Sequence, residues 1–128
     1  MTAARILVVE DNPKNLKLVR DVLQFSGYEV VEASTGEDSV RLAGETRPDL
    51  ILMDLQLPGI DGAEALQRIR ACGGSGAPPV PVLAVTAFAM DQDKRRASSS
   101  GFDGYVEKPI NVRGLLQQVH DLLGRRET

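Results

Sequence analysis

Residues suited to phosphate and metal chemistry stand at the ends of four short apolar runs in this sequence. Parallel strands that are covered on both faces read as continuous apolar runs, and open α/β sheets bind their ligands beyond the carboxyl ends of such strands. Three carboxylates, one hydroxyl and one ammonium group are therefore expected to meet at one edge of a sheet. They belong to Glu10 and Asp11 after the first run, Asp54 after the second, Thr86 after the third and Lys108 just after the fourth.

The three carboxylates predict a bound divalent cation. Carboxylates that lie only a few ångströms apart do not all stay ionised without a counter-charge. Oxygen ligands of this kind suit Mg²⁺, which keeps some of its water, and Mn²⁺ is expected to substitute for it. The cation would also neutralise charge on phosphoryl oxygens during a transfer reaction.

Asp54 is the candidate acceptor of a phosphoryl group. It follows an apolar strand and precedes a Pro-Gly loop, so its oxygens are expected at the centre of the edge and exposed to solvent. A carboxylate can attack phosphorus and hold it as an aspartyl phosphate. Lys108, extended before Pro109, can project its charge towards that group, and the Thr86 hydroxyl can donate a hydrogen bond to it. Each residue alone fits an ordinary surface role, so the hypothesis depends on their joint order along the chain.

The elements that must position these residues alternate along the chain, which indicates repeated βαβ units and an α/β, doubly wound parallel sheet. Asn12 and Pro13 provide a cap and a first residue for one helix, which is expected to stop at Ser26. Five strands are expected near 5–9, 29–33, 49–54, 82–86 and 104–107, and five helices near 13–25, 35–46, 62–72, 90–100 and 112–123.

The helix expected near 90–100 differs from the others because it offers few apolar side chains to the core. Met90 and Ala97 are its main apolar contacts, whereas the last helix carries a strong amphipathic pattern. The fourth helix is therefore predicted to be weakly held, as elements that move in switching proteins often are.

Composition limits the class of protein. The chain has 128 residues with a formal charge of −3, which fits one domain over 1–128 and argues against a general nucleic-acid binder. No stretch reaches membrane-spanning length and no signal peptide is recognisable, so a cytoplasmic protein is expected, with no membrane partner. Cys72 is the single cysteine, which excludes an internal disulfide.

Four motifs together resemble the receiver domain of two-component response regulators, the CheY-like family, over essentially the full chain. They are Ile6-Leu-Val-Val-Glu-Asp-Asn-Pro13, Asp49-Leu-Ile-Leu-Met-Asp-Leu-Gln-Leu-Pro-Gly59, Val85-Thr-Ala-Phe-Ala-Met90 and Gly104-Tyr-Val-Glu-Lys-Pro-Ile110. Within that family the chain is most similar to stand-alone, single-domain regulators of the DivK type, which have no output domain. The resemblance implies a strand order of 2-1-3-4-5.

The resemblance also implies roles for particular residues. Asp54 would accept a phosphoryl group from a phosphohistidine on a histidine kinase or a histidine phosphotransfer protein. Asp11 and Asp54 would bind Mg²⁺ together with the backbone carbonyl of Gln56, and Glu10 would reach the ion through water. Thr86 and Tyr105 would form the switch pair, and the Lys108-Pro109 peptide would be cis. For Tyr105, an amphipathic ring at a strand edge is the competing explanation.

As a member of such a family the chain would be a signalling switch and not an enzyme, catalysing only its own phosphoryl uptake and slow dephosphorylation. Gln56 and Phe88 occupy positions that would screen the attacking water. A downstream protein would read the 90–110 surface and the face of the last helix. The expected state is a monomer, with dimerisation on phosphorylation as an alternative.

Three other functions are possible alternatives for this sequence. A docking module that never uses its phosphorylation site cannot be told apart by sequence. A Mg²⁺-dependent phosphatase with an aspartyl intermediate would use a second acid two residues after the nucleophile, where this chain has Gln56. A flavodoxin-like nucleotide binder would share the fold, but Glu10 and Asp11 would repel a phosphate that lacks a metal.

Overall fold

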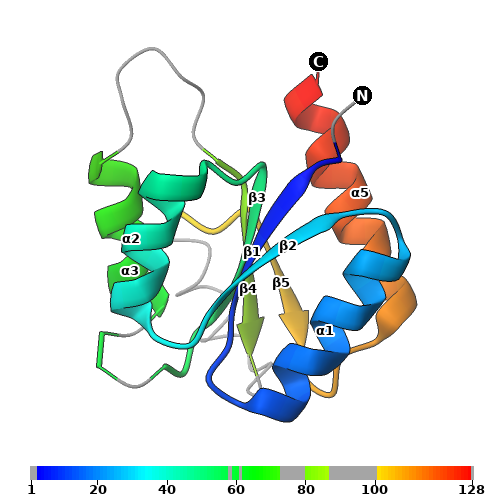
Figure 1. The fold of residues 1–128 in the computed structure, drawn as a ribbon, viewed down its shortest axis with the longest axis horizontal. Coiled ribbons are helices and arrows are strands. Elements are labelled where there is room, and N and C mark those ends of the chain that lie inside the picture. The colour runs from blue at the N-terminus through cyan, green and yellow to red at the C-terminus, as the bar shows by residue number, and fades with distance from the viewer. Residues whose placement is uncertain (1–2, 58, 61, 73–79, 87–100, 128) are drawn as a thin grey trace.

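Five parallel strands form a single sheet at the centre of the molecule (Figure 1). The computed structural model describes residues 3–57, 59–60, 62–72, 80–86 and 101–127. The strand order is β2-β1-β3-β4-β5, so the predicted doubly wound topology is confirmed. The strands are β1 (Arg5–Val9), β2 (Glu29–Ala33), β3 (Leu50–Asp54), β4 (Val82–Thr86) and β5 (Gly104–Glu107).

Helices cover both faces of this sheet. Helices α1 and α5 lie on one face, and α2 and α3 lie on the other (Figure 1). Their bounds are α1 (Pro13–Phe25), α2 (Gly36–Thr46), α3 (Gly62–Cys72) and α5 (Val112–Glu127). The predicted helix near 90–100, and the prediction that it is weakly held, fall outside the described residues. Within the described residues, no helix is long and apolar enough to cross a membrane.

Local side-chain caps explain where the helices begin. The Asn12 side chain accepts hydrogen bonds from the backbone N–H groups of Lys14 and Asn15, at 2.9 and 3.3 Å, and Pro13 occupies the first turn as predicted. The Thr35 hydroxyl accepts one from the Asp38 N–H at 3.0 Å. Helix α5 continues past Leu123, where its apolar pattern ends, to Glu127. Backbone hydrogen bonding extends a helix without further apolar burial.

Alternation along the strands divides the core into two clusters. Successive side chains of a strand point to opposite faces. Even-numbered residues of β1 and β3, such as Val8 and Leu52, pack with α1 and α5, whereas odd-numbered ones, such as Leu7 and Met53, pack with Leu66 and the α2–α3 side. This parity sets the face of the sheet towards which each strand residue points.

Candidate functional site

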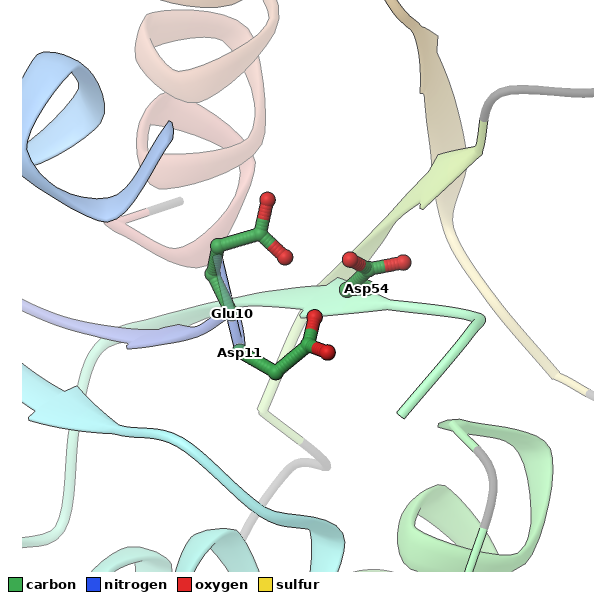
Figure 2. Close-up of side chains that lie close together, drawn as sticks. All are labelled: Glu10, Asp11 and Asp54. Carbon is green, nitrogen blue, oxygen red and sulfur yellow. The ribbon is translucent and has the colours of Figure 1, made fainter. Parts of the chain in front are cut away.

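Glu10 and Asp54 lie side by side at the carboxyl ends of β1 and β3. Val9 pairs with Met53 in the parallel register, so the next residue of each strand reaches the same level of the edge. Both are even-numbered and point towards the α1–α5 face. Asp11 follows in the β1–α1 connection, and one carboxylate oxygen from each of the three residues lies within 4.8 Å of the others. Figure 2 shows the three carboxylates gathered in one space.

Asp54 is buried, which corrects the expectation that its oxygens are exposed to solvent. Only 2% of its surface is accessible. Oδ1 accepts a hydrogen bond from the backbone N–H of Gln56 at 2.9 Å, and Oδ2 accepts one from the Lys108 ammonium at 2.8 Å. Asp54 is covered by the flanking strands β1 and β4 and by the Lys108 side chain. Its position at a strand end would not by itself have predicted this burial. Gln56 directs its side chain to solvent.

Lys108 joins the two buried acids. Its ammonium lies 2.8 Å from Asp54 Oδ2 and 3.2 Å from Glu10 Oε1. Its backbone N–H donates to the Thr86 carbonyl at 2.8 Å, and the Lys108-Pro109 peptide is cis. Burial would lower the pKa of Lys108, but the hydrogen bond and the charge of Asp54, together with the charge of Glu10, outweigh burial and raise it. The ammonium therefore stays charged beside the acids.

Glu10 lies in surroundings that disfavour its ionised form. Burial, followed by the hydrogen bond and the charge of Asp54, raises the pKa of Glu10 from 4.5 to about 7, while Asn15 and Lys108 act in the opposite direction. A cavity of about 10 Å³ beneath Glu10 and Asp54 is lined by apolar side chains that include Val8, Leu52 and Leu115, which accounts for the poor solvation of the two carboxylates. Sequence reasoning missed Asn15; its place in the first turn of the helix after Glu10 was the available signal.

The residues present fit a divalent cation. Glu10 Oε2 is buried and has no hydrogen-bond partner among the described residues. Among the described residues, the three carboxylates gather around one ammonium, that of Lys108, which is paired with two of them, so carboxylates outnumber ammonium groups in the cluster. A hard cation with oxygen ligands satisfies both the unpartnered oxygen and the excess charge.

Thr86 and Tyr105 lie on the opposite face from the acids. Tyr105 pairs with Ala84 in the register of β4 and β5, and its ring packs in the cluster on the α2–α3 side. Alternation from Ala84 places the buried Thr86 on that same face. The two residues predicted as a switch pair therefore share one side of the sheet, opposite the side towards which Glu10 and Asp54 point. Phe88, predicted to screen the site, is outside the described residues.

Comparison with known proteins agrees with this arrangement. Residues 6–120 match the model of the response regulator receiver domain. The polar-differentiation response regulator DivK of Brucella anthropi is 41% identical over 119 residues, which cover 93% of this chain and 95% of that protein. Its counterpart in Brucella ovis is 40% identical over the same shares.

Solved structures give the same result. A CheY-like receiver domain protein of Methanospirillum hungatei has a TM-score of 0.88 at 29% identity, covering 98% of each chain. The receiver domain of a Pseudomonas aeruginosa sensor histidine kinase, with a magnesium ion coordinated in its active site cleft, has a TM-score of 0.86 at 35% identity, covering 96% of this chain and 99% of its own. This chain belongs to the response regulator receiver domain family.

Proposed function

We propose that the chain is a stand-alone, cytoplasmic response regulator that takes a phosphoryl group from a phosphohistidine onto Asp54. The donor is a histidine kinase or a histidine phosphotransfer protein, and the reaction depends on Mg²⁺. The observation that carries the proposal is a buried carboxylate held between an ammonium at 2.8 Å and two further acids within 4.8 Å. Burying such a cluster costs folding free energy, and perturbed charged groups of this kind concentrate at functional sites.

In this reaction an Asp54 oxygen forms a bond to phosphorus while the P–N bond of the donor breaks. The electron pair of that bond leaves on the imidazole of the donor. Lys108 neutralises the acceptor and the incoming oxygens, and the Gln56 N–H orients the carboxylate by its hydrogen bond to Oδ1. Bound Mg²⁺ supplies additional charge neutralisation for the phosphoryl oxygens.

The proposed ligands of the cation are Asp11, Asp54 and the backbone carbonyl of Gln56, with Glu10 reaching it through water. Glu10 Oε2 is buried and has no hydrogen-bond partner in the part of the chain that the structure describes, which supports a place for Glu10 in this set. Mn²⁺ is expected to replace Mg²⁺ because both accept carboxylate and water ligands.

The switch that follows would involve Thr86 and Tyr105. Once Asp54 is phosphorylated, the Thr86 hydroxyl is drawn towards the phosphoryl group and leaves room for the Tyr105 ring. Their common face and the hydrogen bond between the Thr86 carbonyl and the Lys108 N–H support this coupling. A downstream protein would read the change on the 90–110 surface and the α5 face. We propose a monomer that loses its phosphoryl group slowly.

Intact-mass measurement of phosphoryl uptake from a small-molecule donor tests this function. Native protein with Mg²⁺ should gain the mass of one phosphoryl group, and Asp54→Asn should gain none. Asp21→Asn, at an exposed carboxylate on α1, is the matched control and should behave like native protein. Chelation of the metal should stop uptake. Uptake by Asp54→Asn would remove Asp54 as the acceptor, and uptake by none of the proteins would favour the docking module.

A further inference from the structure

The first turn of α2 holds the connection that follows β3. Glu37 Oε1 accepts a hydrogen bond from the backbone N–H of Ile60 at 2.8 Å, across 23 residues of sequence. Gly59 lies directly beneath this carboxylate: a Cβ there would be 2.6 and 2.9 Å from its two oxygens. Gly59 also has φ +78°, a conformation that L side chains rarely adopt. The carboxylate of Glu37 is therefore fitted against this stretch of backbone.

The backbone of α2 approaches the same stretch equally closely. A Cβ on Gly36 would lie 2.5 Å from Ile60 Cγ1 and 2.7 Å from the Ile60 carbonyl oxygen. A glycine is required on each side of the contact, at Gly36 and at Gly59. Such mutual fitting fixes the position of Ile60 relative to the start of α2.

The other end of this connection belongs to the acid cluster. The Leu55 N–H donates to the Val85 carbonyl at 3.0 Å, and the Gln56 N–H donates to Asp54 Oδ1 at 2.9 Å. Leu57 is buried in the core cluster on the α2–α3 side. Gln56 therefore lies in a short span of backbone whose far end is restrained by Glu37.

We propose that Glu37 is a positioning residue for the metal site. By fixing Gly59 and Ile60 it restrains the backbone that carries Gln56, so it increases the affinity for Mg²⁺ and the rate of phosphoryl uptake at Asp54. This inference rests on the proposed function. Glu37 itself lies on the surface, in the first turn of a helix on the opposite side of the sheet from α1 and α5, and its influence passes through the backbone.

Three variants separate this role from an effect of charge. Glu37→Ala removes both the carboxylate and the acceptor, whereas Glu37→Gln keeps an amide oxygen that can accept from the Ile60 N–H. Glu45→Ala is the matched control because Glu45 is an exposed acid of the same helix that pairs only with Arg41 among the described residues. Glu37→Ala and Glu45→Ala change the net charge equally.

Amide hydrogen exchange without metal and calorimetric titration with MgCl₂ provide the measurements. In Glu37→Ala the amides of Ile60 and Gln56 should exchange faster. Mg²⁺ affinity should fall about threefold to tenfold, less than the full value of a hydrogen bond to a charged group, because the effect reaches the metal site only through the backbone. Glu37→Gln should recover most of that affinity. Glu45→Ala should match native protein in both measurements.

Native affinity in Glu37→Ala, an equal fall in Glu45→Ala, or no recovery in Glu37→Gln would overturn the proposal. Phosphoryl uptake is measured on the same proteins. If native protein takes up no phosphoryl group, the proposed function fails, while the exchange of the Gln56 amide and the Mg²⁺ titration still decide the role of Glu37.

Discussion

Replacing Glu10 by glutamine should remove most of the loss of stability that the metal-free protein suffers as pH rises. The pKa of Glu10 is raised from 4.5 to about 7 in the folded protein, chiefly by burial and by Asp54. Folding therefore favours the protonated acid. The associated stability is fully present below pH 4.5 and is lost as pH rises through about 7.

The size of this effect follows from the two pKa values. At about 1.4 kcal/mol per pH unit, the native protein should lose roughly 2–3 kcal/mol of unfolding free energy between about pH 5 and pH 8 through this one group. With a urea dependence of about 1–3 kcal/mol per molar, the unfolding midpoint should move by roughly 1–2 M. Glutamine has the shape of the protonated acid and does not ionise, so the variant should lack this component.

The assay is urea unfolding in the presence of a chelator at several pH values. Glu45→Gln makes the same chemical change at an exposed site of α2 and should keep the pH dependence of native protein. Parallel pH curves for native protein and Glu10→Gln would refute the reasoning. Saturating Mg²⁺ should stabilise native protein more than Glu10→Gln at pH 8, because the cation favours the ionised cluster.

Three further outcomes are expected. Lys108→Met leaves Asp54 Oδ2 without its ammonium donor, so the rate of phosphoryl uptake by intact mass should fall about 100-fold, and an unchanged rate would remove Lys108 from the reaction. The apparent Kd for Mg²⁺ in calorimetry should fall about tenfold between pH 6 and pH 8, since the cation competes with the proton on Glu10, and Glu10→Gln should flatten this dependence. Gly62→Ala should lower the unfolding free energy in urea by about 1–3 kcal/mol, because its Cβ would lie 2.7 Å from the Asp54 carbonyl oxygen. The control Gly44→Ala, whose Cβ would have no described atom within 4 Å beyond its chain neighbours and the backbone of its own helix, should raise the unfolding free energy by up to about 1 kcal/mol. Equal effects of the two substitutions would contradict the close packing at Gly62.

Most of the sheet was predictable because each strand is a continuous apolar run followed by a change in residue type. β1, β2, β4 and β5 coincide with the predicted ranges, and β3 starts one residue later, at Leu50. The start of α1 was predictable because Asn12 and Pro13 act locally. The end of α5 was not, since its last turn carries no apolar pattern that marks a boundary.

The composition of the acid cluster was predictable, but its contacts and burial were not. The parallel pairing of β1 with β3 places Glu10 and Asp54 next to each other, regardless of the conformation of their side chains. Whether a carboxylate there is exposed or buried depends on how Lys108 folds over it, and that conformation is set by packing distant in sequence. The contact between Glu37 and Ile60 escaped prediction for the same reason, because an acid in the first turn of a helix is already explained by the helix dipole.

Strand parity places the buried acids and the ring of the proposed switch residue Tyr105 on different faces of the sheet. Glu10, Asp54 and Lys108 lie towards α1 and α5, whereas Tyr105 packs towards α2 and α3. A charge placed on Asp54 therefore has to act across the plane of the sheet. One hydrogen-bonded route runs through the end of β4, where the Thr86 carbonyl accepts from the Lys108 N–H at 2.8 Å. This backbone bond joins Lys108, which pairs with the proposed acceptor, to Thr86, which is proposed to sense it, so we expect the two faces to be coupled through the end of β4.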